Sequence, residues 1–534
     1  MIEELNAITL EIFKNKFSSI AEEMGVVLFK TAFSPNIKER KDHSCAIFDK
    51  NGDMIAQAAH IPVHLGSMPL SVKSAISRVS MNKGDMVFLN DPFMGGTHLP
   101  DITMVAPVFI DDEILFYVAN RAHHADIGGI SAGSMPLSST IFQEGMIIPP
   151  TKLIKKGKLQ KDILNLVISN VRTPVERQGD FEAQIMANLT GIKRLKEISS
   201  LYGKNRMLFL SRKLIEYSEN IMRKTIQMIP NGKYSFEDYL DDDGLDTKKI
   251  NINVRINITN DEVIVDFSGS HAQVKCSINA VKAITLSAVL YVFRSLTEED
   301  IPTNAGCLRP IEVIIPEGTV VDAKYPCAVA GGNVETSQRV VDVLLGALSK
   351  AIPDVIPAAS QGTMNNLSIG GYDNSKKESF TYYETIGGGN GASKLRNGES
   401  GIHSHMTNTM NTPIEAIEFE YPLRVKEYRI RKRSGGDGIK SGGDGIIRKI
   451  EVLCDAEVTL LSERRFFEPY GLKDGNSGSK GVNKLQSGKI LDILPGKFHR
   501  FLKKGDIIHI ETPGGGGYGN TAGDDVTLKE KNNN

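Results

Sequence analysis

The chain has 534 residues, and its 63 Lys and Arg residues are balanced by 64 Asp and Glu residues. This charge gives no electrostatic basis for binding nucleic acid, and the length predicts about two to four domains. No run of about 18 apolar residues could span a membrane. The N-terminal segment lacks a signal-peptide pattern, and the five scattered cysteines are typical of a reducing compartment. We therefore expect a cytoplasmic protein.

The first part of the chain alternates predicted helices with short strands. Apolar residues at helical spacing predict a helix from Leu5 to about Thr31, which Ser34-Pro35 ends. Further elements predicted here are strands over Ser44–Phe48, Met54–Ala58 and Asp85–Leu89 and a helix over Pro69–Val79.

A β-hairpin is predicted next. Thr103–Phe109 and Ile114–Asn120 are apolar segments, and Ile110–Glu113 between them reads as a turn. A hairpin brings its two ends together, so residues just before the first strand should lie near residues just after the second.

The rest of the chain changes from helical to strand-rich. Residues 161–228 are largely helical in pattern, and the segment beyond Pro357 is rich in Gly, Asn and Ser with short strands. Between them we predict a hairpin (Ile250–Ile258 and Val263–Phe267), helices over Asn279–Ser295 and Glu335–Ile352, and a strand over Ile311–Ile315. The predicted fold class is α+β with several mixed sheets. We divide it into regions 1–230 (candidate metal site), 231–356 (α/β) and 357–534 (β-rich and glycine-rich).

Glycine is unusually frequent, with 50 residues, many of them in pairs or longer clusters. For most pairs the simplest interpretation is a tight turn in a strand-rich protein. Gly95-Gly96 and Gly128-Gly129 differ because each lies beside a patch of His and Asp. There the backbone must curl to aim several side chains at one point.

The two ends of the predicted hairpin carry the candidate metal ligands. His98 and Asp101 precede its first strand, and His123 and His124 follow its second. Imidazole and carboxylate groups that converge from two loops suit a divalent metal with open coordination positions. Adjacent residues leaving a strand point to opposite sides, so the choice between His123 and His124 stays open. Asp42 could supply another oxygen, although on spacing alone solvation explains it better.

Signatures of other catalytic classes are missing from the sequence. There is no Gly-x-x-x-x-Gly-Lys-Ser/Thr loop and no Gly-x-Gly-x-x-Gly between a clear strand and a helix. No nucleophile elbow, a Gly-x-Ser-x-Gly turn between a predicted strand and a predicted helix, appears either. If the reaction needs ATP, we expect another polypeptide to bind it.

Six long motifs follow one another along the chain: residues 38–46 (KERKDHSCA), 90–101 (NDPFMGGTHLPD), 121–129 (RAHHADIGG), 408–415 (NTMNTPIE), 464–471 (RRFFEPYG) and 512–519 (TPGGGGYG). They resemble those of the hydantoinase B/oxoprolinase family. The resemblance runs from the N-terminal helix to about Asn520, and the order of the long motifs makes it specific.

The resemblance implies one half of an ATP-dependent enzyme that opens cyclic amides, such as a hydantoinase or 5-oxoprolinase. An A-type subunit would bind ATP and phosphorylate the carbonyl oxygen of the substrate, so we expect a hetero-oligomer. The present chain would supply the metal site (Zn, Mn or Fe) at which the activated carbon is attacked by water. Carried over from the family, the metal ligands are Asp42, His98, Asp101 and His123. This choice favours His123 over its neighbour.

Three further residues are candidates for proton transfer: His124, Asp126 and Glu144. They could equally orient the ligands or close the loop. Two other functions stay open. The chain could be the large subunit of an ATP-dependent ketone carboxylase of the acetone or acetophenone type, or a non-catalytic assembly subunit. All four ligand positions are intact, which argues against the assembly subunit, and a simple pair of A and B chains favours the hydrolase.

Overall fold

The computed structural model describes residues 7–58 and 61–520. Its N-terminal part is built on an antiparallel sheet of seven strands in the order β2-β1-β5-β4-β3-β6-β7. The strands are β1 (His43–Asp49), β2 (Met54–Gln57), β3 (Met86–Leu89), β4 (Asp101–Ile110), β5 (Glu113–His123), β6 (Thr151–Lys155) and β7 (Lys158–Leu159).

Helices cover both faces of this sheet because its strands are apolar on both sides. Successive side chains of a strand point to opposite faces, and Met104 and Val105 of β4 accordingly enter two different apolar clusters. Met104 shares its cluster with α1 (Ala7–Thr31) and α5 (Pro174–Tyr202), and Val105 lies with α3 (Ser67–Arg78). The shorter or peripheral helices are α2 (Pro35–Lys38), α4 (Lys161–Ile168) and α6 (Lys204–Gln227).

The middle part contains a four-stranded sheet in the order β11-β10-β9-β8. Its strands are β8 (Gly232–Asp242), β9 (Lys248–Thr259), β10 (Glu262–Asp266) and β11 (Ile311–Ile314), with β11 parallel to β10. The helices are α7 (Lys282–Ser295) and α8 (Ser337–Leu348), every residue of which is buried. The largest apolar core contains residues from both the N-terminal and the middle parts.

The C-terminal part consists of two antiparallel sheets and one short helix, α9 (Ile414–Glu420). An apolar core with residues of both sheets, such as Val458 and Ile510, lies between them. The first sheet, in the order β13-β12-β16-β19, comprises β12 (Asn366–Asp373), β13 (Glu378–Glu384), β16 (Ala456–Leu461) and β19 (Lys497–Leu502). The second, in the order β14-β15-β20-β17-β18, comprises β14 (Leu423–Arg431), β15 (Gly445–Val452), β17 (Val482–Ser487), β18 (Ile490–Leu494) and β20 (Ile507–Glu511).

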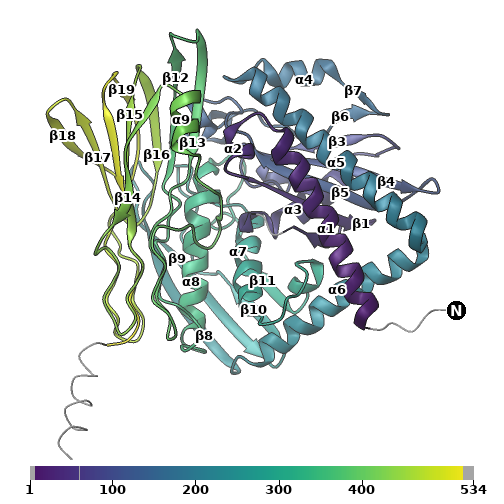
Figure 1. Ribbon diagram of the computed structural model, residues 1–534. Helices are drawn as coiled ribbons and strands as arrows, with labels where there is room; N and C mark the ends of the chain where they lie inside the picture. The colour runs from purple at the N-terminus through teal and green to yellow at the C-terminus, as the bar shows by residue number, and fades with distance from the viewer. Residues whose placement is uncertain (1–6, 59–60, 521–534) are drawn as a thin grey trace, which may run out of the picture.

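The glycine clusters of the C-terminal part are not tight turns, so that prediction is wrong for them. None of Gly387–Gly389, Gly435-Gly436, Gly442-Gly443 and Gly514–Gly517 has a positive φ. Instead, extended segments lie against one another, as the long loops drawn below β14 in Figure 1 show. A Cβ on Gly515 would lie 2.0 Å from the carbonyl oxygen of Asn390, and one on Gly442 would lie 2.0 Å from that of Gly515. Glycine is required here for close backbone approach.

Most predicted elements are present, and the fold is α+β as expected. Some predicted boundaries differ by a few residues, and at one of them a side chain holds the backbone in a loop. The predicted helix Asn279–Ser295 begins only at Lys282. Asn279 accepts a hydrogen bond from the Val274 amide and donates to the Val274 and Cys276 carbonyls, which keeps it in a loop.

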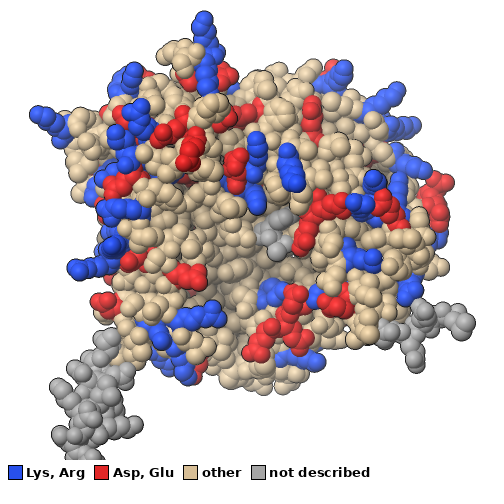
Figure 2. Space-filling view, viewed as in Figure 1, with Lys and Arg blue, Asp and Glu red and all other residues tan. Residues whose placement is uncertain are grey.

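Charged side chains of both signs are intermixed over the face shown in Figure 2, around a hollow that is mostly lined by uncharged residues. No helix in the described ranges is long and apolar enough to cross a membrane. None of the five cysteines, all of which lie in the described ranges, forms a disulfide. The division into regions 1–230, 231–356 and 357–534 remains a proposal.

Candidate metal site

The β4–β5 hairpin places its two ends side by side, as the sequence predicts. Asp101, the first residue of β4, is directly opposite His123, the last residue of β5. The Gly95 turn and the Gly128-Gly129 turn flank these ends with φ of 92°, 88° and 88°. These left-handed conformations suit glycine and carry the chain toward and away from the two residues.

Three buried side chains converge on one point at this end of the hairpin. His98 Nε2, His123 Nδ1 and Asp101 Oδ1 form a triangle whose three edges are each 3.2 Å. The exposed fraction of all three side chains is 3% or less. Among the described residues they are the one group of His, Cys, Asp or Glu whose ligand atoms lie close enough to hold a metal ion.

The triangle has the dimensions expected of ligands to a divalent ion. Three donors about 2.1 Å from one ion lie about 3.0 Å apart at right angles and about 3.4 Å apart in a tetrahedron. Hydrogen bonds explain the arrangement less well, because pointing an N–H of each imidazole at Asp101 leaves two N–H groups facing each other. The residues therefore fit a bound cation.

The other oxygen of Asp101 is held from behind. Asp101 Oδ2 accepts a hydrogen bond from the Thr97 hydroxyl at 2.6 Å and lies 3.2 Å from His64 Nε2. His64 Nδ1 is in turn 2.9 Å from the Ser44 hydroxyl. Although burial would raise it, the imidazoles of His98 and His64 hold the pKa of Asp101 well below its usual range. Asp101 therefore stays ionised, as a ligand must.

Asp42 lies beside the triangle but outside it. It lines a small cavity of about 20 Å³ together with Asp101 and His123. Its carbonyl accepts a hydrogen bond from the backbone amide of His123 at 3.0 Å. Asp42 is not part of the group whose ligand atoms lie within 4.8 Å of one another.

His124 and Asp126 point to other parts of the molecule. His124 Nε2 is 3.0 Å from Gln184 Oε1 of α5, and its ring lies 4.7 Å from the ring of Phe181. Burial lowers the pKa of His124 to about 4. Asp126 forms an ion pair with Arg172 at 3.0 Å and accepts from the Gly128 amide. These contacts hold the loop that follows β5.

Glu144 is fully buried, away from the three residues of the triangle in sequence and held by different partners. One of its oxygens accepts hydrogen bonds from the Ser138 hydroxyl and from the backbone amides of Val329 and Ala330. Its other oxygen has no hydrogen-bond partner in the described structure. Burial raises the pKa of Glu144 to about 7, although the hydrogen bonds from Ala330, Ser138 and Val329 act to lower it. A carboxyl with this pKa can give or take a proton near neutrality.

Three further residues of the site were not predicted from the sequence. Besides His64, these are Asn333, whose Nδ2 lies 3.1 Å from His98 Nε2, and Tyr383, whose ring stacks on His123 at 4.7 Å. Asn333 lies in a π-helical turn, Gly332–Thr336, that precedes α8. The turn packs closely against the loop at Asn279, since a Cβ on Gly332 would lie 1.9 Å from the Asn279 carbonyl oxygen.

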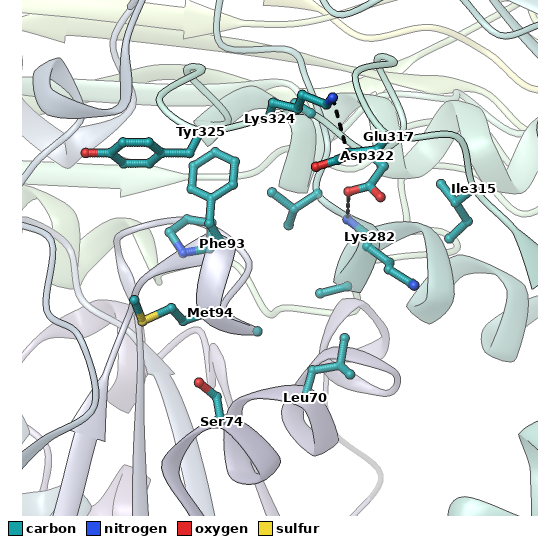
Figure 3. A pocket seen from close by; sticks show the side chains of 15 residues that line it. Leu70, Ser74, Phe93, Met94, Lys282, Ile315, Glu317, Asp322, Lys324 and Tyr325 are labelled. Carbon is teal, nitrogen blue, oxygen red and sulfur yellow. Dashed lines mark hydrogen bonds and ion pairs between the residues drawn. The ribbon is translucent and has the colours of Figure 1, made fainter. Parts of the chain in front are cut away.

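A larger surface cavity of about 630 Å³ lies beyond the turn that leads to His98. Phe93 and Tyr325 stand edge to face in it with ring centres 5.6 Å apart, and Lys324 pairs with Glu317 at 3.3 Å (Figure 3). None of the predicted site residues lines this cavity.

The model of one known protein family matches almost the whole chain. The model of the hydantoinase B/oxoprolinase family matches residues 6–521. The chain belongs to the hydantoinase B/oxoprolinase family. This confirms the resemblance inferred from the sequence motifs.

Two similar family members differ greatly in length. An uncharacterised protein of Methanocaldococcus jannaschii is 44% identical over 98% of this chain and 92% of its own length. The 5-oxoprolinase of Dictyostelium discoideum is 40% identical over 97% of this chain but only 40% of its own length. The chain thus spans about two fifths of that 5-oxoprolinase.

Solved structures of similar proteins have the same fold. The ATP-dependent caprolactamase of Pseudomonas jessenii superposes with a TM-score of 0.89 at 26% identity, over 97% of this chain and 92% of its own. An acetone carboxylase superposes with a TM-score of 0.87 at 18% identity, over 97% and 76% of the two chains. The second likeness concerns the fold alone.

Proposed function

We propose that this chain is the metal-bearing, B-type part of an ATP-dependent hydrolase of cyclic amides. The observation that carries the proposal is the buried triangle of His98, Asp101 and His123 in a member of the hydantoinase B/oxoprolinase family. A 5-oxoprolinase and a caprolactamase, which are similar to it, act on cyclic amides by name. We place the reaction in the cytoplasm, since none of the five cysteines in the described ranges forms a disulfide.

In this proposal His98, Asp101 and His123 hold a divalent ion (Zn, Mn or Fe), and Asp42 supplies a fourth ligand from the wall of the same cavity. The ion, when bound, would supply Lewis-acid polarisation and lower the pKa of water. The protein keeps the ligands in place: Thr97 and His64 hold Asp101, and Tyr383 stacks on His123. Such supporting contacts tune a metal site.

The activating chemistry is assigned to a separate A-type polypeptide. An amide carbonyl resists attack because its nitrogen donates electrons to the carbon, and phosphorylation of the oxygen removes that protection. This chain spans 40% of the Dictyostelium 5-oxoprolinase, so the remaining regions of that protein have room for the ATP-binding part. The burial of the triangle suits a reactive intermediate, which must be kept from bulk water.

Within this mechanism we assign proton transfer to Glu144 and supporting roles to His124 and Asp126. Glu144 has a free carboxyl oxygen and a pKa near neutrality. His124 is fixed on Gln184 and Asp126 on Arg172, so that both hold the end of β5 that carries His123.

Co-expression with an A-type partner tests the function. The complex should open L-5-oxoproline or a hydantoin only when ATP is present, and His98→Ala should abolish this. His271→Ala is the matched control, because His271 lies outside the triangle and binds the carbonyl of its neighbour Ala272. Incorporation of labelled bicarbonate into a ketone, with every cyclic amide left intact, would instead identify a carboxylase.

A further inference from the structure

Arg40 is a buried cation whose hydrogen-bond acceptors are all uncharged groups. Its side chain is completely buried. Its guanidinium donates hydrogen bonds to the Asn36 side-chain oxygen, the Tyr383 carbonyl and the hydroxyls of Thr385 and Thr409. No carboxylate in the described part of the chain forms an ion pair with it, and Nε lacks a hydrogen-bond partner there. A buried charge without a counter-ion is costly, so an anion that reaches its surroundings would be stabilised.

Three threonine hydroxyls connect Arg40 to the cavity beside the metal triangle. Arg40 Nη2 lies 2.8 Å from the Thr385 hydroxyl and 3.2 Å from the Thr409 hydroxyl. The Thr385 and Thr409 oxygens are 2.9 Å apart, and Thr407 is 3.4 Å from Thr409. All three threonines line the cavity that Asp42, Asp101 and His123 also line.

Counting protons shows that this chain of hydroxyls has one donor to spare. Three hydroxyls carry three protons, and their two mutual contacts use two of them. The third proton is left for an acceptor. Because Arg40 donates to two of the hydroxyl oxygens, it polarises the connected hydroxyls and strengthens the remaining O–H donor.

The same elements tie this donor to the metal triangle. The Arg40 guanidinium lies 5.1 Å from the centre of the Tyr383 ring, and that ring stacks on His123 at 4.7 Å. A group bound at the threonines would therefore lie in the cavity of the triangle, separated from Arg40 only by the hydroxyls.

We propose that Thr385, Thr407 and Thr409, backed by Arg40, form a subsite that receives an anionic oxygen of the substrate. The cavity of about 20 Å³ admits one oxygen-sized group in this state. The inference rests on the proposed function for the identity of the substrate. The anionic oxygen belongs either to a carboxylate carried by the cyclic amide or to the phosphoryl group placed on its carbonyl.

Binding to the full chain tests the subsite without requiring turnover. Calorimetry would compare inorganic phosphate, L-5-oxoproline and 2-pyrrolidinone, the same ring without a carboxylate, for the wild type, Thr409→Val and Thr381→Val. Thr409→Val removes one hydroxyl at nearly constant volume, and Arg40→Lys serves as a second variant. Thr381→Val is the matched control, because Thr381 is equally buried on β13 but does not line the cavity.

The expected result is a loss of anion affinity of roughly 10-fold to 100-fold in Thr409→Val, with Thr381→Val unchanged. A loss for L-5-oxoproline but not 2-pyrrolidinone identifies the carboxylate as the occupant, and a loss for inorganic phosphate alone identifies the phosphoryl group. Wild-type affinities in both Thr409→Val and Arg40→Lys, or no binding of any anion by the wild type, would overturn the subsite. Anion binding without ring opening by the complex would contradict only the proposed function.

Discussion

Asp101 and His123 face each other across the open end of the β4–β5 hairpin, with Oδ1 and Nδ1 3.2 Å apart. The register of the hairpin thus sets the position of both side chains. A shift of the register by one residue would turn His123 to the other face of the sheet. The metal site depends on strand pairing as much as on the identity of its ligands.

His64 should matter for metal binding although it is outside the triangle. His64→Ala removes the group 3.2 Å from Asp101 Oδ2, so Asp101 loses one of its two supports. We expect metal affinity to fall roughly 10-fold to 100-fold, measured by competition with a chelating dye. His64→Gln, which can still donate to Asp101, should recover part of the loss. Equal affinity in wild type and His64→Ala would show that Thr97 alone fixes the carboxylate.

Glu335 should make stability depend on pH. Burial raises its pKa to about 8, above its ordinary value of 4.5. An acid whose pKa is raised by folding contributes stability that is fully present below its pKa in the unfolded chain. This contribution is lost as the pH rises through its pKa in the folded protein. The free energy of unfolding of Glu335→Gln, relative to that of the wild type, should therefore rise by about 2 kcal/mol from pH 6 to pH 8.

Urea unfolding of both proteins at the two pH values measures this gain. Asn366 and the Met364 amide donate to one oxygen of Glu335, and Gln can accept both bonds, so the variant should fold. A difference that does not change between pH 6 and pH 8 would mean that Glu335 is ionised throughout.

The C-terminal glycines should tolerate no side chain. Gly515→Ala places a Cβ where the Asn390 carbonyl oxygen lies 2.0 Å away, and the backbone must move. We expect destabilisation by roughly 1–3 kcal/mol or more, seen as a lower Tm. Gly232→Ala is the control, because its Cβ would first meet the flexible hydroxyl end of Tyr234 at 2.9 Å. Similar Tm values for the two variants would contradict the close packing of the backbones.

The sequence predicted the hairpin and the meeting of His98, Asp101 and His123 because these depend on local patterns. Alternating apolar segments define the two strands, and the candidate ligands lie at their ends. It did not predict His64, Asn333 or Tyr383, since they reach the site through tertiary packing; Asn333 is 235 positions from His98. The glycine clusters were misinterpreted for the same reason, because their close neighbours are distant in the sequence.

The metal content of the purified chain tests the central claim most directly. Elemental analysis should find about one divalent transition ion per wild-type chain and per His271→Ala chain. His98→Ala and His123→Ala should each lose most of it, since each removes one corner of the triangle. Folding of every variant would be checked by circular dichroism. Equal metal content in wild type, His98→Ala and His123→Ala would contradict the account.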